Sequence, residues 1–406
     1  MSGKIEISQS KLEPVGSLFR AGEFAKAENF YIKVLSEDHE NCQALARLGY
    51  IALLADRLDD AQKWLTKAIK LKPNESIPKS LLAEVFYRRD EFQQAAPLLR
   101  VIGREAMAKK LESFKDVSPY QIEGETEVTN LRFVITDPLP VVQVQVNESD
   151  LVNFFIDTGG AEVIIDTEFA KEIGAVQFGS QMGTFAGGKQ AGFQHGRVDS
   201  LALGDFTVKN LPVHIMDVRR FSQPIFRGRR VDGIIGTVLL YHFLATIDYP
   251  EGQLVLRRKT EQNLKQIEKK AKIIVPFWMA GDHYMVAWGK VSNSQPMLFL
   301  VDTGLAGGGF TCPESTIKKA NIKLQEDKAG EGIGGGGKVR VVPFVVDELT
   351  LGDAREHNIQ GLYTENFPLE NSFGFHIGGL ISHGFFRHYA LTLDFAKMRY
   401  FLKRKE

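Results

Sequence analysis

The chain has 406 residues, 44% hydrophobic and 25% charged, which is typical of a soluble globular protein with two to three domains. Lys plus Arg and Asp plus Glu both number 50, so there is no overall positive field to hold a polyanion, and we exclude nucleic acid as the main partner. The longest apolar runs have the length of strands, so no membrane span is expected.

The compartment follows from the N-terminus and the cysteines. The first residues lack the apolar core of a signal peptide, and Cys42 and Cys312 fit no metal or disulfide pattern. We therefore predict a cytoplasmic protein without metal or cofactor. A chain from which a signal peptide had been removed would look the same, so a secreted or periplasmic location stays open.

The first third of the chain, residues 1–115, shows a step of 34 residues. This step links Ala27, Ala61 and Ala95, and period 34 is typical of the tetratricopeptide repeat. The middle copy fits best, although Leu45 stands where the pattern often has Trp. The sequence predicts an α-solenoid of three such repeats and a capping helix near residues 104–114. Its concave surface either binds a protein partner or is a scaffold packed on the next domain.

A β-rich region follows. Residues 116–127 are polar with Pro and Gly and are predicted to be a linker. Short alternating runs then predict two β lobes, residues 128–258 and 274–406, joined by a second linker at 259–273. Brief helices are expected near 167–173, 238–243 and 315–320, and a short surface helix or tether over 260–272.

The same tripeptide ends an apolar run in each lobe. Asp157-Thr158-Gly159 and Asp302-Thr303-Gly304 lie 145 residues apart. Further landmarks recur in the same order at nearly the same offset: 201–205 with 349–353, 233–236 with 379–382, and 246–249 with 392–395. The order and spacing predict one unit built twice, with a carboxylate at the same place in each copy.

In this arrangement, residues 128–403 resemble the retropepsin-like aspartic proteases, with two lobes fused in one chain. The resemblance implies an all-β, two-lobed fold in which Asp157 and Asp302 form a catalytic dyad at the lobe interface. Thr158 and Thr303 would cross-link the two loops beneath it, and Gly159 and Gly304 would permit tight turns close to the carboxylates. Two carboxylates about 3 Å apart share one proton, which suits them to activate water.

A glycine-rich stretch follows each triplet. In the resembled family this stretch is the flap, a hairpin that closes over an extended peptide. The flap residues would be Phe185, Ala186, Gly187 and Gly188 in the first lobe and Gly334, Gly335 and Gly336 in the second. Phosphate-loop spacing also occurs at 332–338, but Val339 replaces the required Ser or Thr and a strand follows, so we reject a nucleotide site.

Some residues depart from the family pattern. Gly160 and Leu305 follow the triplets where a residue such as Ser or Thr can hydrogen-bond the carboxylate, and Ser382 replaces a glycine. We predict an aspartic endopeptidase acting on peptides or proteins as a single chain, with the repeats recruiting or regulating substrate. The alternative is a catalytically weak or inactive peptide-binding or adaptor protein on the same fold.

Five arginines crowd one segment of the first lobe. They either favour acidic residues in a peptide or belong to a solvated loop. They are Arg219, Arg220, Arg227, Arg229 and Arg230.

Overall fold

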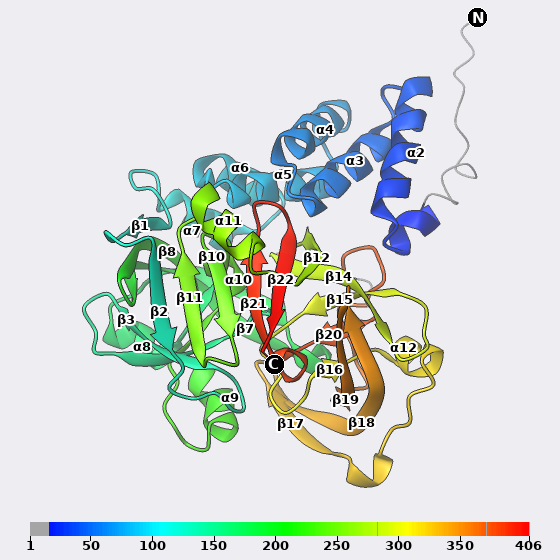
Figure 1. The fold of residues 1–406 in the computed structure, drawn as a ribbon. Helices are drawn as coiled ribbons and strands as arrows, with labels where there is room; N and C mark the ends of the chain where they lie inside the picture. The colour runs from blue at the N-terminus through cyan, green and yellow to red at the C-terminus, as the bar shows by residue number, and fades with distance from the viewer. Residues whose placement is uncertain (1–15, 282, 371, 406) are drawn as a thin grey trace, which may run out of the picture.

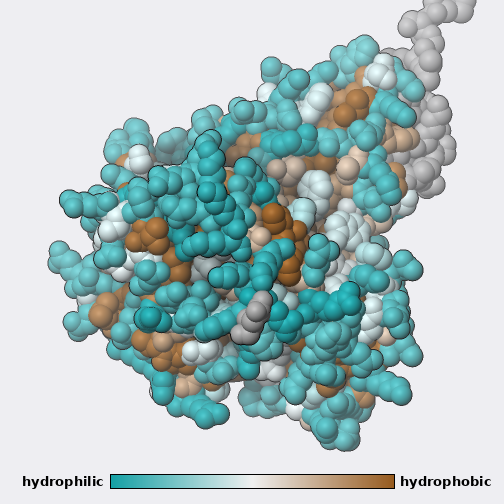
Figure 2. All heavy atoms as spheres, viewed as in Figure 1, coloured by the Kyte–Doolittle hydropathy of each residue, from teal (hydrophilic) through white to brown (hydrophobic). Residues whose placement is uncertain are grey.

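A computed structural model describes residues 16–281, 283–370 and 372–405. Helical repeats come first and a β-rich region with three sheets follows (Figure 1). Figure 2 shows a face covered mainly by hydrophilic residues, with hydrophobic residues in small separate groups. No helix in the described part of the chain is long and apolar enough to cross a membrane.

The helical array is built from antiparallel pairs with small residues at their contacts. Ala27, Ala61 and Ala95 are all fully buried, and a Cβ added at Gly49 would lie 2.5 Å from Cγ of Leu65. These residues let neighbouring helices approach closely, as the 34-residue period predicted. After a helical stretch at 16–20, the helices are α2 (Phe24–Glu37), α3 (Cys42–Leu54), α4 (Leu58–Leu71), α5 (Ser76–Arg88), α6 (Phe92–Val101) and α7 (Glu105–Glu112).

The first lobe is an eight-stranded sheet in the order β1-β8-β5-β9-β4-β3-β7-β6. Its strands are β1 (Gln121–Glu123), β3 (Val141–Val146), β4 (Val152–Ile156), β5 (Val163–Asp166), β6 (Val176–Thr184), β7 (Gln190–Leu203), β8 (Phe206–Met216) and β9 (Gly233–Ile235). Its helices are α8 (Thr167–Glu172), η1 (Ala186–Gly188), α9 (Val218–Ile225) and α10 (Thr237–Tyr241). Strand β1 lies inside the segment expected to be a linker and pairs with β8.

The second lobe repeats this sheet in the order β13-β14-β15-β20-β16-β19-β18-β17. Its strands are β13 (Trp278–Ala280), β14 (Tyr284–Val291), β15 (Met297–Val301), β16 (Phe310–Thr311), β17 (Gly330–Gly334), β18 (Gly337–Leu351), β19 (Ala354–Tyr363) and β20 (Gly379–Ile381). Its helices are α12 (Glu314–Lys319), η2 (Glu326–Lys328) and α13 (His383–Phe386), while α11 (Glu261–Glu268) lies between the lobes.

A six-stranded sheet joins the two lobes in the order β12-β22-β21-β10-β11-β2. At its centre β10 of the first lobe pairs with β21 of the second, and Thr246 and Thr392 share a hydrogen bond of 2.8 Å between their hydroxyls. These threonines are equivalent in the duplication, so the pseudo-twofold axis passes between them. The strands are β2 (Val128–Arg132), β10 (Leu244–Asp248), β11 (Gln253–Arg257), β12 (Ile273–Pro276), β21 (Tyr389–Asp394) and β22 (Arg399–Arg404).

The helical array packs against both lobes, with α3 and α5 contacting the second lobe and α7 the first. From α5, the buried Arg88 donates from Nη2 to the carbonyl of Met279 in the second lobe at 3.0 Å. From α3, Tyr50 donates to the carbonyl of Phe373 at 3.0 Å. The array lies on the side of the molecule away from β17 and α9 (Figure 1). The domain limits at 115, 127, 258 and 273 remain our proposal.

Candidate active site

The two triplet loops leave their sheets in the same way. Strand β4 runs parallel to β9, and Asp157 N–H donates to the carbonyl of Ile235 at 3.0 Å. In the second lobe β15 runs parallel to β20, and Asp302 N–H donates to the carbonyl of Ile381 at 3.0 Å. The segments 233–236 and 379–382, which recur in the duplication, therefore hydrogen-bond to the first residue of each triplet.

The threonines cross-link the loops. Thr158 Oγ1 donates to the carbonyl of Val301 at 2.8 Å and accepts from Thr303 N–H at 3.1 Å. Thr303 Oγ1 donates to the carbonyl of Ile156 at 3.3 Å and accepts from Thr158 N–H at 3.0 Å. Both threonines are fully buried, and each hydroxyl has both a donor and an acceptor partner. This reciprocal set fixes one loop against the other without leaving a buried polar group unpaired.

The two carboxylates meet across the lobe interface. Gly159 N–H donates to Oδ1 of Asp157, and Gly304 N–H donates to Oδ1 of Asp302, both at 2.8 Å. A Cβ added at Gly159 would lie 2.3 Å from Cγ of Asp302, and one at Gly304 would lie 2.2 Å from Cγ of Asp157. Only glycine at these two positions leaves room for the carboxylate of the opposite lobe.

The surroundings of the two carboxyl groups favour a state in which one of them keeps its proton. Burial, followed by the neighbouring Asp302 carboxylate, raises the pKa of Asp157 well above its ordinary value. Burial also raises the pKa of Asp302, against hydrogen bonds that lower it. Both residues remain part-exposed, so solvent reaches the pair.

Two supporting hydroxyls were not anticipated from the sequence. Thr237 Oγ1 donates to the carbonyl of Thr158 at 2.8 Å, and Ser382 Oγ accepts from Leu305 N–H at 3.2 Å. Ser382 ends the repeated landmark 379–382, directly after β20, and Thr237 directly follows its counterpart 233–236; these positions were the available signal. The hydroxyls support the backbone of the loops, whereas Gly160 and Leu305 offer the carboxylates no hydroxyl.

The expected flap residues form two hairpin tips that touch. The tip between β6 and β7 contains Phe185, Ala186, Gly187 and Gly188, and the tip between β17 and β18 contains Gly334, Gly335 and Gly336. A Cβ added at Gly334 would lie 3.2 Å from Cβ of Ala186, and one at Gly336 would lie 2.5 Å from Cβ of Lys189. Phe185 and Ile333 pack on a common apolar cluster in the first lobe.

A buried ion pair joins the helical array to the first triplet loop. Lys110 of α7 is fully buried, and its Nζ lies 2.6 Å from each carboxylate oxygen of Glu162, five residues after Asp157. Tyr87 also donates to Glu162, at 2.5 Å. Burial would raise the pKa of Glu162, but Lys110, then His214 and the Tyr87 hydroxyl, lower this pKa to about 2.

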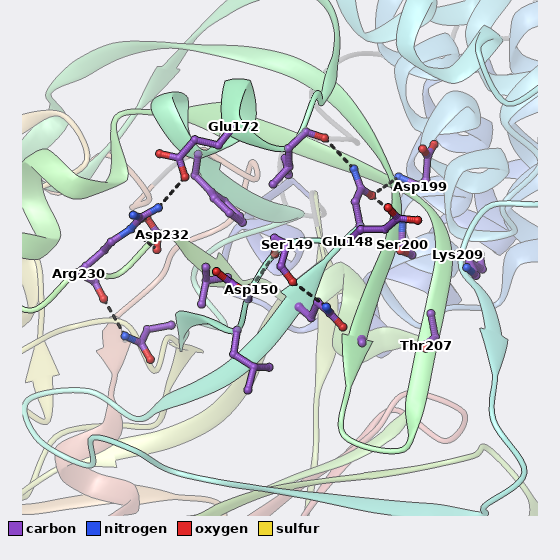
Figure 3. A pocket seen from close by; sticks show the side chains of 18 residues that line it. Glu148, Ser149, Asp150, Glu172, Asp199, Ser200, Thr207, Lys209, Arg230 and Asp232 are labelled. Carbon is purple, nitrogen blue, oxygen red and sulfur yellow. Dashed lines mark hydrogen bonds and ion pairs between the residues drawn. The ribbon is translucent and has the colours of Figure 1, made fainter.

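A large cavity lies away from the triplets. Its volume is about 1070 Å³, and Figure 3 shows that residues such as Glu148, Asp199 and Lys209 line it. Arg230, also in its lining, pairs with Glu172 and Asp232. No triplet residue lines this cavity, so we assign it no part in the chemistry. Among the described residues, no group of three or more His, Cys, Asp or Glu side chains could hold a metal ion.

Comparison with known families agrees with this geometry. Residues 142–239 and 288–380 match the aspartyl protease family, one segment from each lobe, and residues 18–85 match the tetratricopeptide repeat. An aspartyl protease family domain and a tetratricopeptide repeat array are therefore present in this chain, which confirms the resemblance predicted from the paired triplets. A search of curated proteins found no match.

Proposed function

We propose that this protein is an aspartic endopeptidase with Asp157 and Asp302 as its catalytic dyad. The observation that carries the proposal is the symmetric pair of carboxylates, each bonded to a glycine N–H of its own loop and facing the glycine of the other. The ionised member takes a proton from a bound water, which attacks the peptide carbonyl, and the other member protonates the carbonyl oxygen. The roles then reverse as the amine leaves, and no covalent intermediate forms.

The test is hydrolysis of a diverse peptide library by the wild type, Asp157→Asn and Asp302→Asn between acid and neutral pH. We expect each variant to lose about 10²–10⁴-fold in kcat/KM without any fall in Tm, because general acid–base catalysis supplies a factor of that size. Asp150→Asn, an exposed aspartate between β3 and β4, is the matched control. Undiminished hydrolysis by Asp157→Asn would refute the assignment.

The repeats are proposed to brace the two lobes. Their first helices, α3 and α5, bury Arg88 and place Tyr50 against the second lobe, and α7 buries Lys110 against the first. These contacts occupy the side of the array that faces the protease. Recruitment of substrate by the array would then use an outward helix such as α4, which lies farther from the lobes in Figure 1.

A second candidate function is peptide binding without hydrolysis. Gly160 and Leu305 favour it, because neither side chain carries a hydroxyl for the adjacent carboxylate. Tight binding of a statine-like peptide analogue together with no turnover of any peptide would support this function over the endopeptidase.

A further inference from the structure

A second cavity, of about 480 Å³, lies where the two lobes meet beside the second triplet loop. Gly307 forms part of its wall and follows Gly304 by three residues, so the wall lies within about 11 Å of a glycine that contacts the Asp157 carboxylate. A peptide spans about 3.3 Å per residue when extended. The cavity therefore lies within about three residues of the bond that the dyad would cleave.

The floor of the cavity is apolar. Ile135, before β3, and Ile225 and Phe226, at the end of α9, line it. The same side chains belong to the apolar cluster on which the flap residues Phe185 and Ile333 pack. The apolar lining of the cavity and the flap residues therefore share one apolar cluster.

The rim of the cavity is positively charged. Arg227, Arg229 and Arg387 line it, with Asp137 as the one acidic lining residue. Arg387 of the second lobe pairs with Asp137 of the first. Arg227 and Arg229 are exposed and have no ion-pair partner among the residues that the structure describes. Two guanidinium groups therefore remain available to a ligand.

The arginine-rich segment thus divides into two sets. Arg219 and Arg230 both bind Asp232 and hold the segment to the first lobe. Arg227 instead stands at the cavity with φ of 53°, a left-handed conformation that few residues other than glycine adopt. Glycine would be less strained at this position, yet the chain has an arginine there, and that arginine lines the cavity.

We propose that this cavity is a specificity pocket for a substrate residue with an apolar stem and an acidic tip, glutamate foremost. The proposal rests on the endopeptidase function. The apolar floor would cover the methylene groups, while Arg227 and Arg229 bind the carboxylate, since guanidinium groups pair with carboxylates in a bidentate manner. Arg387 already forms an ion pair with Asp137, and this pair between the lobes sets the width of the pocket.

The test compares peptides that differ only in Glu or Gln at each of the three positions on either side of the cleaved bond. For the full-length wild type we expect kcat/KM to favour Glu by about 10- to 100-fold at one position, as for a hydrogen-bonded charge pair. Arg227→Gln/Arg229→Gln should reduce the Glu peptide to the level of the Gln peptide. Arg220→Gln, on helix α9 just before these two arginines and outside the cavity, should keep the preference.

A charge reversal strengthens the test. Arg227→Glu/Arg229→Glu should transfer the preference at that position from Glu to Lys. An active wild type without preference for Glu, or a double glutamine variant that keeps it, would overturn the proposal.

A binding measurement separates this proposal from the proposed function. Fluorescein-labelled apolar peptides with a single Glu or Gln are titrated against Asp302→Asn, and the Kd is read by fluorescence anisotropy. If the wild type cleaves no peptide, the proposed endopeptidase function is wrong. The pocket is then supported if Glu peptides bind more tightly than Gln peptides and this difference depends on Arg227 and Arg229, and it is overturned if they do not.

Discussion

Asp157 and Asp302 occupy equivalent positions in the two lobes and share one environment. Burial raises the pKa of both carboxyls, and the Asp302 carboxylate raises the pKa of Asp157 further, so the state with both ionised is disfavoured and we expect the pair to titrate as a unit. The glycines at 159 and 304 create this state, because any side chain there would displace the opposite carboxylate. The tripeptide thus sets the protonation chemistry of the other lobe as well as its own loop.

The raised pKa of Asp157 predicts a pH dependence of activity. Hydrolysis needs one protonated and one ionised carboxyl, so kcat/KM should fall as pH rises through the raised pKa and again when acid protonates the second member. A pH profile of kcat/KM checks this. An alkaline limb near the ordinary aspartate pKa of about 4 would contradict it.

The same shift predicts an effect on stability. A carboxyl whose pKa is raised on folding stabilises the fold below its ordinary pKa, and this contribution is lost as pH rises through the raised value. Asp157→Asn removes the charge, so its Tm should be higher than that of the wild type at pH 7. This increase in Tm should be smaller at pH 4. Asp150→Asn should show no such difference, and an equal gain at both pH values would argue against a shifted pKa.

The buried Lys110–Glu162 pair gives a further prediction. Lys110→Met leaves a buried carboxylate without its cation, which costs about 3–5 kcal/mol in the free energy of unfolding. Adding Glu162→Gln should recover much of this loss, and Lys171→Met, in an exposed pair with Glu168, should change little. Urea unfolding measures all three, and equal effects of the two lysine changes would contradict the burial argument.

The Lys110–Glu162 pair should also lose its contribution to stability in acid. Because the pKa of Glu162 is lowered to about 2, its contribution to stability is present above the ordinary glutamate pKa and is lost as pH falls toward 2. The wild type should lose this contribution in that window, and Glu162→Gln should not.

At the scale of elements, the two flap hairpins, one from each lobe, contact each other at their tips. Glycine allows this contact at several places, including Gly336 beside the backbone of Lys189. The brief helices expected near 167–173, 238–243 and 315–320 are present as α8, α10 and α12. Helix α9 was not anticipated, although its apolar residues recur at 218, 221 and 225, because its arginines masked a short amphipathic pattern.

The tip contact predicts a difference between two glycines of one hairpin. Gly336→Ala would place a Cβ 2.5 Å from Cβ of Lys189 and should force the tips apart, whereas Gly330→Ala meets nothing within 4 Å. We expect Gly336→Ala to raise KM for peptides several-fold at similar Tm, because flap closure contributes to substrate binding. Identical kinetics for the two variants would show that tip contact is dispensable.

At the scale of the whole molecule, the helical array and the two lobes share one core. A single cluster of buried residues contains Tyr87, Phe92 and Leu111 of the array together with Phe154 and Phe299 of the lobes. Buried hydrogen bonds from Arg88 and Lys110 cross the same interface. An array that served only to recruit a partner would not need buried charges directed into the lobes.

Removal of residues 1–115 should therefore damage the protease itself. We expect the truncated chain to lose Tm by on the order of 10 °C or more, or to aggregate, because apolar surface and buried polar groups become exposed. Co-expression of the missing segment should restore soluble, active protein. A truncated chain with unchanged Tm and activity would show that the array is an accessory.

The sequence by itself determined the helical period, the duplication and the pair of triplets, because these depend on local spacing that the residues display directly. Only the tertiary structure decided that Lys110 neutralises Glu162, that Thr237 and Ser382 support the loops, and that two of five arginines line a pocket between the lobes. Each of these contacts joins residues that are distant in the chain. Their partners are selected by how the lobes and the array pack, and local periodicity carries no record of that packing.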